Sequence, residues 1–293
     1  MSFAWVLNLD AELELARGRP GYVPKAKLLA QLAEHGQRSR ALLGPHDVLL
    51  EGQSSRLGSP REMLRGRAWC PTPLALERLA ELGIEPEPHP PAAVLRRVNH
   101  RLFAHALGGG LPTQAYVTSR AQLSDVLGDY RRSWLLKRPL TFAGRGQLRA
   151  IGPLTDKQWT WVDASLDKDG LIIEPLVQPR LEVSLHGFVW PAGTHELGRP
   201  CVQDVSERGT FRDVRLARPG ELSQREAELL EASAERVARA LHGAGYFGPF
   251  GIDAHRYRDG ATEDFCALGE INARYTLAFA VGFPRHPSEL ELT

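Results

Sequence analysis

Three oxygen-bearing side chains near the end of the chain have the types and spacing of a metal site. Asp253 lies in the apolar run 250–254, and Glu270 and Asn272 follow in the run 268–274 after a short, hairpin-like excursion. Side chains alternate between faces along a strand, so Glu270 and Asn272 point the same way and a neighbouring strand can add Asp253. Such oxygens suit Mg²⁺, which proteins usually hold together with phosphate oxygens and water. The trio therefore predicts a magnesium–phosphate site, and a surface hairpin with solvated acids is the alternative.

A lysine upstream stands where a phosphate site needs a cation. Lys137 ends the apolar run 134–137 and is followed by the segment 141–147, which reads Thr-Phe-Ala-Gly-Arg-Gly-Gln. A buried cation needs a partner, and the free backbone N–H groups of a glycine loop can wrap an anion closely. Most of the 36 basic residues are arginines, so a lysine here indicates a chemical role. An edge-strand lysine that reaches water past a simple turn is the alternative.

Taken together, these motifs resemble the ATP-grasp superfamily, whose members hold ATP between two α+β lobes. Most of them join a carboxylate to an amine or thiol through an acyl phosphate. The similarity covers about residues 95–285. It implies an α/β protein with α+β lobes: an ATP-grasp fold with an N-terminal Rossmann-like pre-grasp domain. The implied domains are the pre-grasp domain at 1–92, the first lobe at 93–171, and the second lobe with the metal site at 172–293.

The resemblance also implies roles for individual residues. Asp253, Glu270 and Asn272 would hold the metal, and Lys137 would contact phosphates. The other implied nucleotide contacts are Gly144, Arg145 and Gly146 of the glycine-rich loop, Glu174 at the adenine amino group, Leu176 and Val177 at the ring edge, Glu182 at the ribose, and Arg208 at a phosphate. Arg212 and Arg274 are the implied catalytic residues, which would stabilise the transferred phosphoryl group or the tetrahedral centre that follows.

One position departs from the family pattern. Many members carry a second lysine after an Asn or Asp that opens a helix of the first lobe, and the similar place here reads Val98-Asn99-His100-Arg101. Arg101 or Arg97 would have to supply the charge, and a planar guanidinium is not interchangeable with an ammonium group. A weaker similarity links the segment 206–212, Ser-Glu-Arg-Gly-Thr-Phe-Arg, to the branch of glutamate ligases that resembles ribosomal-modification enzymes.

Composition predicts a cytoplasmic enzyme. The chain has 293 residues and a formal net charge of +1, so no charge excess favours nucleic acid or an anionic membrane as a partner. Cys70, Cys201 and Cys266 are odd in number and widely spaced, and we expect reduced, buried thiols. The first residues lack the basic start of an export signal, and no apolar run approaches the roughly 18 residues of a membrane span.

Hydrophobic patterning predicts the elements that would position these residues. The proline-rich stretch at 84–91 predicts a linker. Ser223 and Glu226 form a capping box in front of an amphipathic helix that ends near Gly243. The other expected elements are helices at 24–32, 74–82 and 99–107, first-lobe strands near 113–118, 134–137 and 147–151, and second-lobe strands near 171–176, 181–190 and 211–216.

Three functions are compatible with these features. The first is an ATP- and Mg²⁺-dependent ligase, with Mn²⁺ as an alternative metal, that joins a carboxylate to an amine. Its substrates would be amino acids, peptides or small metabolites, and it would be compatible with a homodimer. The second is a nucleotide-binding protein that has lost ligation, which the missing lysine favours. The third is a phosphoryl- or thiol-directed variant of the same lobes, which would show turnover without an amine.

Overall fold

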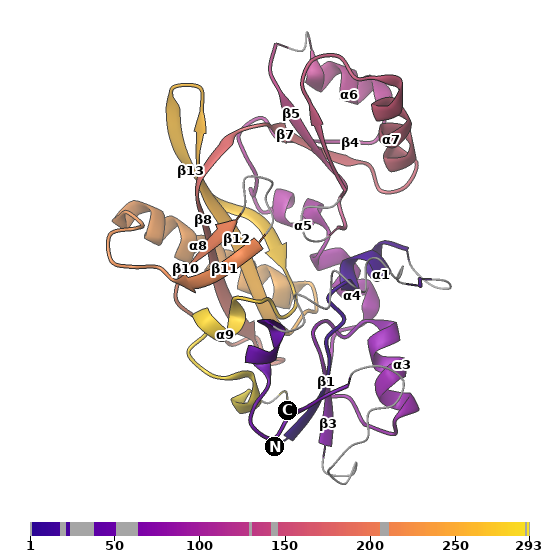
Figure 1. The fold of residues 1–293 in the computed structure, drawn as a ribbon, viewed down its shortest axis with the longest axis vertical. Coiled ribbons are helices and arrows are strands. Elements are labelled where there is room, and N and C mark those ends of the chain that lie inside the picture. The colour runs from indigo at the N-terminus through magenta and orange to yellow at the C-terminus, as the bar shows by residue number, and fades with distance from the viewer. Residues whose placement is uncertain are drawn as a thin grey trace.

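A computed structural model describes residues 2–17, 22–23, 38–50, 64–128, 131–141, 146–205, 211–290 and 292 (Figure 1). Strands in these segments form three sheets, of three, four and six strands. The expected helix at 24–32 lies outside the described residues. Among the helices that are described, none is both long and apolar enough to cross a bilayer.

The N-terminal unit is built on a parallel sheet with the order β2-β1-β3. Its central strand β1 is mostly apolar and buried, as expected of a parallel strand that is covered on both sides, whereas β3 carries two arginines. The parallel order agrees with the Rossmann-like domain that the sequence implies. The elements of this unit are β1 (Ser2–Val6), α1 (Ala11–Arg17), η1 (Arg40–Leu42), β2 (Val48–Leu49), β3 (Leu64–Ala68) and α3 (Pro73–Glu81).

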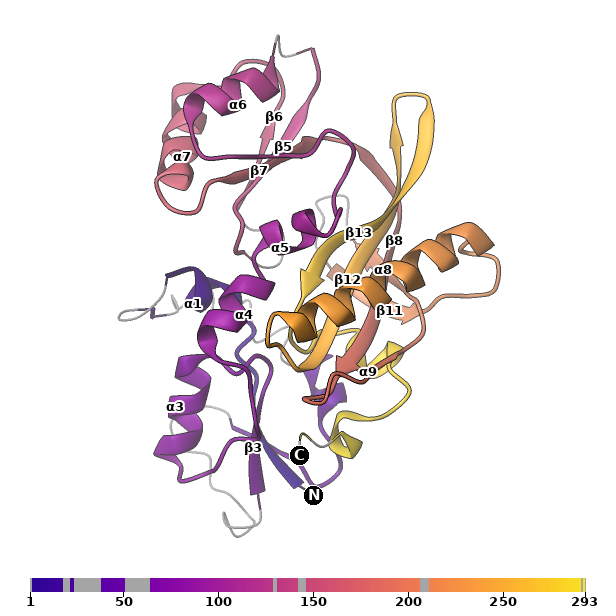
Figure 2. The ribbon, with the colours of Figure 1, turned by 180° about the vertical axis from the view of Figure 1, so that it is seen from behind.

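The next unit is an antiparallel sheet with the order β4-β7-β5-β6 (Figure 2). Helices α6 and α7 pack on it through Leu123 and Val162, which share an apolar core with Leu136 of β5. The expected placement of the 171–176 strand in the second lobe was wrong. That strand, β7, pairs with β4 and β5, because its run of buried apolar side chains completes the first-lobe core. The elements of this unit are β4 (Ala115–Val117), α6 (Arg120–Leu127), β5 (Trp134–Lys137), β6 (Gln147–Ala150), α7 (Asp156–Leu166) and β7 (Leu171–Pro175). The helices α4 (Ala92–Val98) and α5 (Arg101–Ala106) precede it in the chain and pack into the core of the six-stranded sheet.

The third unit is an antiparallel sheet with the order β11-β10-β8-β12-β13, and β9 pairs with β8. The long helix α8 packs on this sheet through Leu230, Val237 and Leu241. Its predicted capping box is confirmed, since the Ser223 and Glu226 side chains exchange hydrogen bonds with each other's backbone N–H groups. The elements are β8 (Gln178–Val189), β9 (His195–Leu197), β10 (Cys201–Val205), β11 (Phe211–Leu216), α8 (Gln224–Gly243), β12 (Gly248–Asp259), β13 (Thr262–Asn272), α9 (Phe279–Gly282) and η3 (Pro287–Glu289).

A buried arginine joins the N-terminal sheet to the end of the chain. Arg67 of β3 is 1% exposed, pairs with Glu87 of the proline-rich linker at 2.7 Å, and stacks over the Phe3 ring. It also donates hydrogen bonds to the carbonyl oxygens of Pro287 and Leu290. A buried arginine is tolerated because each of these groups offsets its lost hydration. The largest apolar core accordingly contains residues of both the N-terminal unit and the six-stranded sheet.

The expectation of reduced cysteines is also confirmed, since Cys70, Cys201 and Cys266 are free and buried.

Candidate functional site

The candidate site lies where the four-stranded and six-stranded sheets meet. The chain passes from β7 almost directly into β8, so this connection carries it from one sheet to the other (Figure 1). Lys137 and Glu174 come from the first sheet, on β5 and β7. The second sheet supplies acids from β12 and β13, where Asp253 stands opposite Glu270 in the strand register and Gly251 stands opposite Asn272. Two sheets that are distant in sequence therefore converge on one group of polar side chains.

Asp253 is the centre of the predicted metal trio. The Asn272 side-chain amide donates to Asp253 Oδ2 at 2.8 Å, and Gln203 of β10 donates to Oδ1 at 3.0 Å. Burial, and then the nearby Glu270 carboxylate, raise the pKa of Asp253 to about 6. Two acids that repel each other in this way form a site that a divalent cation would stabilise. In the described part of the chain no three His, Cys, Asp or Glu side chains converge as metal ligands, so a metal here would rely on two carboxylates and the Asn272 amide.

Lys137 faces this group from the other sheet. It forms an ion pair with Glu174, and both side chains are mostly buried. Burial and the Lys137 charge lower the pKa of His255 on β12 to about 4, so this imidazole is neutral at pH 7. Burial and the Asp253 charge raise the pKa of Glu182 on β8, which Lys137 opposes. The lysine thus acts electrostatically on two strands of the second sheet.

A small apolar cluster lies beside these charges. Val177, in the connection between β7 and β8, packs against Leu111, Tyr257 and Cys266. Burial raises the pKa of the Cys266 thiol to about 11, so the thiol is neutral. The backbone N–H of Leu176 donates to the Ser133 carbonyl at 2.9 Å. The site therefore offers an apolar wall next to the Lys137 and Glu174 charges.

Two arginines, Arg97 and Arg101, could replace the missing second lysine, and of these two it is Arg101 that faces the candidate site. Arg101 Nη2 lies 2.9 and 3.0 Å from the two carboxylate oxygens of Glu270, whereas Arg97 is exposed. Asn99 fixes this corner, because its side chain accepts from the backbone N–H of Ala273 at 2.8 Å and donates to the same residue's carbonyl at 3.3 Å. The sequence had pointed to the Asn-His-Arg corner. It carried no signal for Gln203, whose contact with Asp253 depends on the pairing of β10 with β8.

Arg274 reaches from the predicted metal trio to the N-terminal unit. Its guanidinium donates to the Asn272 side-chain oxygen at 2.9 Å and forms an ion pair with Glu12 of α1. The guanidinium also lies 5.3 Å from the centre of the Trp69 ring. Glu12 Oε2 and Trp69 Nε1 are buried and have no hydrogen-bond partner among the described residues. The sequence did not predict a role for Glu12, because its partner lies more than 260 residues away.

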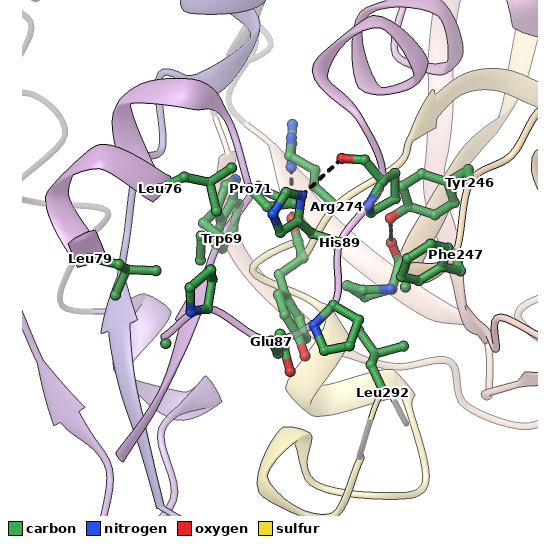
Figure 3. A pocket seen from close by; sticks show the side chains of 18 residues that line it. Trp69, Pro71, Leu76, Leu79, Glu87, His89, Tyr246, Phe247, Arg274 and Leu292 are labelled. Carbon is green, nitrogen blue, oxygen red and sulfur yellow. Dashed lines mark hydrogen bonds between the residues drawn. The ribbon is translucent and has the colours of Figure 1, made fainter. Parts of the chain in front are cut away.

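A cavity of about 30 Å³ adjoins Arg274 and Trp69 (Figure 3). Its walls come from β3, α3, the proline-rich linker and the loop before β12, and they include Tyr246, Phe247 and His89. A cavity of this size holds about two water molecules. It is therefore too small for a metabolite in this conformation.

The other predicted residues fall into three groups. Gly144, Arg145 and Arg208 lie outside the described residues. Gly146 has φ +63°, and a Cβ there would lie 2.3 Å from the Thr141 methyl group, so only glycine fits. Arg212 is exposed on the edge strand β11, and β10 and β8 lie between it and the Asp253 strand. The structure does not bring Arg212 into the group around Asp253.

No protein-family model matches this sequence, and no curated protein matches it. Among solved structures, N5-carboxyaminoimidazole ribonucleotide synthetase from Thermus thermophilus is 21% identical with a TM-score of 0.52, over 94% of this chain and 72% of its own. D-alanyl-alanine synthetase A from Vibrio cholerae is 14% identical with a TM-score of 0.54, over 93% and 88%. Biotin carboxylase from Campylobacter jejuni, solved as a β,γ-ATP complex, is 13% identical with a TM-score of 0.58, over 96% and 66%.

Each of these likenesses extends over nearly the whole of this chain, at low identity. Such similarity concerns the arrangement of the elements and leaves the substrate open. Three features of this arrangement lie at the candidate site: the order of the three sheets, the crossing from β7 into β8, and the β12–β13 hairpin. The fold class predicted from the sequence is therefore confirmed, and this chain has the ATP-grasp fold.

Proposed function

We propose that this protein is an ATP- and Mg²⁺-dependent ligase that joins a carboxylate to an amine through an acyl phosphate. The observation that carries the proposal is the pair of facing acids, Asp253 and Glu270, opposite a lysine from the other lobe. Burial, and then repulsion from Glu270, raise the pKa of Asp253 to about 6, and a bound cation would offset the cost of holding both carboxylates charged. Acids placed merely for solubility would instead be exposed and separate.

The donor set fits a hard divalent cation. Asp253 and Glu270 would hold Mg²⁺ or Mn²⁺, and Asn272 would contribute its side-chain oxygen, which now accepts from Arg274. When bound, the cation would offset the charge of the nucleotide phosphates and of the approaching carboxylate. Gln203 would keep Asp253 oriented, since it already donates to one carboxylate oxygen.

The nucleotide would lie along the connection between the two sheets. Its base would rest on the apolar cluster at Val177, with Glu174 and the backbone near Leu176 at the ring edge. Glu182, whose raised pKa reflects burial beside Asp253, would accept from the ribose hydroxyls. Lys137 would leave Glu174 for the α- and β-phosphates, because a phosphate carries more charge than one carboxylate.

The chemistry would proceed in two balanced steps. A carboxylate oxygen of the acid substrate attacks the γ-phosphorus, the bond to the β-phosphate oxygen breaks, and ADP leaves. The amine nitrogen then attacks the acyl carbon, phosphate leaves, and the nitrogen loses a proton. Arg274, held by Asn272 and Glu12, would stabilise the charge on the transferred group. Residues 144–146 would exclude water, which otherwise hydrolyses the acyl phosphate.

The proposal includes an assignment of domains. Residues 1–92 would form the pre-grasp unit and help to bind the acid or amine. We place the boundary between the lobes after β7, near residue 176, because β7 belongs to the first sheet. The substrates would be small molecules or peptides, with no role for nucleic acid or membrane, and the protein would act in the cytoplasm.

The test is ADP release from ATP and Mg²⁺ in the presence of pooled acids and amines. We expect release only when both an acid and an amine are present. Tight Mg²⁺-dependent ATP binding without release in any pool would instead favour a nucleotide-binding protein that has lost ligation, the alternative that Arg101 in place of lysine supports. Release that needs no amine would favour the phosphoryl- or thiol-directed alternative. No binding of ATP at millimolar concentration would refute all three.

A further inference from the structure

Arg101 places a nitrogen atom where Glu270 would hold a cation. Nη2 lies 2.9 Å from Oε1 and 3.0 Å from Oε2, so a single positive group sits between both carboxylate oxygens. The same guanidinium is anchored at its other end, because Nη1 donates to the Arg138 carbonyl at 2.7 Å and to Thr141 Oγ1 at 2.9 Å. The Arg101 side chain is 9% exposed, so water competes little for these bonds.

We propose that Arg101 is a built-in counter-ion for Glu270 that keeps a bare divalent cation out of the site, so that metal binds only together with nucleotide. The inference rests on the proposed function, since it takes Glu270 as a metal ligand. It assigns Arg101 a task different from that of a lysine in the same place. A flexible ammonium group could move between partners, whereas this guanidinium is fixed at both ends.

The reason that nucleotide would release Glu270 is the geometry of the guanidinium. A bare cation must displace Nη2 from both oxygens of Glu270 and leave a mostly buried guanidinium without a carboxylate partner, which is costly. A phosphate group offers new acceptors that the planar guanidinium can contact in pairs. Arg138, which holds Arg101, directly follows Lys137, the proposed phosphate contact. Lys137 cannot take over this task in the nucleotide-free protein, because it is paired with Glu174.

The experiment is a thermal-shift titration of the full chain with Mg²⁺ alone, ADP alone, and both. The variants are Arg101→Met, which removes the charge and keeps an apolar stem, and Arg97→Met, the matched control at an exposed arginine close by. Each variant is compared with its own metal-free melting temperature, so a loss of stability in Arg101→Met does not enter the result. If Arg101→Met does not fold, Arg101→Lys takes its place as the test variant, because a lysine side chain cannot contact Glu270 and the Arg138 carbonyl at the same time.

We expect Mg²⁺ alone to leave the melting temperature of the wild type and of Arg97→Met unchanged. The same Mg²⁺ should raise that of Arg101→Met by about 2–4 °C at roughly ten times the dissociation constant. Adding Glu270→Gln to Arg101→Met should abolish the rise, which locates the metal. Equal responses of wild type and Arg101→Met to Mg²⁺ alone, whether both flat or both raised, would overturn the inference. If Mg²⁺ and ADP together raise the melting temperature of the wild type no more than ADP alone does, the proposed function is refuted. The response of Arg101→Met to Mg²⁺ alone would still decide the role of Arg101.

Discussion

The raised pKa of Asp253 predicts how stability should change with pH in the metal-free protein. Burial and the Glu270 charge raise this pKa from 3.8 to about 6, so the native state holds a proton that the unfolded chain has already lost between these pH values. The stabilising contribution of the protonated group is complete below about pH 4, falls as pH rises to about 6, and is then constant. The wild type should therefore lose stability over this range relative to Asp253→Asn, which cannot titrate.

The size of the effect follows from the same values. A difference of about two pKa units corresponds to about 3 kcal/mol, and because Asp253 keeps part of its surface exposed we discount this to about 1–2 kcal/mol. The assay is urea unfolding of wild type and Asp253→Asn at a series of pH values with a metal chelator. The substitution also breaks hydrogen bonds, and their loss changes the free energy of unfolding by the same amount at every pH. This constant contribution cancels when only the change of the free energy with pH is compared.

A control runs in the opposite direction. The hydrogen bond from Arg120 lowers the pKa of Asp163, so its contribution is present above the pKa of the unfolded chain and is lost as pH falls. Asp163→Asn should thus show a difference of the opposite sign, and a smaller one, because this pair is exposed. If the difference between wild type and Asp253→Asn stays flat from about pH 4 to 7, Asp253 titrates as an ordinary surface acid, and the repulsion that supports a cation site is absent.

Three further substitutions have separable effects. Lys137→Ala should weaken ADP binding by about tenfold or more in calorimetry, since a charge-assisted contact contributes about 1.5–3 kcal/mol, whereas Lys157→Ala, an exposed lysine, should leave it unchanged. Gln203→Met should reduce the Mg²⁺-dependent part of ADP affinity by about tenfold and spare binding without metal, because Gln203 orients Asp253; equal loss in both would contradict that role. Arg67→Met should cost about 3–5 kcal/mol in urea unfolding with normal ADP affinity, because it leaves the buried Glu87 carboxylate and the Leu290 carbonyl without their partner, and neither is a proposed ADP contact.

Local patterns predicted the elements that carry Asp253, Glu270 and Asn272, the proposed metal ligands. The alternation of side chains in β12 and β13 gave the shared face, and the register of the hairpin places Asp253 opposite Glu270. The capping box of α8 was likewise readable, since both of its side chains lie within one turn. These features depend on neighbours in the sequence or on a single hairpin, which is where hydrophobic period and capping rules apply.

Features that depend on pairing between distant segments were not readable. The β7 strand was assigned to the wrong sheet, because its apolar sequence fits any buried strand and only its neighbours β4 and β5 decide. Gln203 looks like an ordinary strand residue until β10 lies beside β8. The alternatives at Arg97 and Arg101 differ only in which one turns inward, and that depends on how Asn99 docks on Ala273.

The ion pair between Glu12 and Arg274 has one of two roles. Either it positions the proposed metal ligands, or it only attaches the N-terminal unit to the rest of the protein. Glu12 bonds Arg274, which in turn donates to Asn272, so a change on α1 can reach a predicted metal ligand through one guanidinium group. Glu14, two residues along the same helix, instead accepts from Thr72 and from the backbone of Leu74. The two glutamates are thus matched in burial and helix, and they differ in whether they contact the site.

We predict that Glu12→Gln weakens ADP binding in the presence of Mg²⁺ by about tenfold and leaves ADP binding without metal unchanged. The physical reason is that a neutral amide holds the guanidinium less firmly than a carboxylate does, so Arg274 no longer fixes the Asn272 oxygen. Glu14→Gln should lower the melting temperature without this split, since its partners lie within the N-terminal unit. Calorimetry with and without Mg²⁺ measures both. If the two variants lose stability alike and neither changes the Mg²⁺ dependence, the Glu12 pair only fastens the N-terminal unit to the lobes, and Arg274 is positioned by its other contacts, with Asn272, Tyr275 and the Trp69 ring.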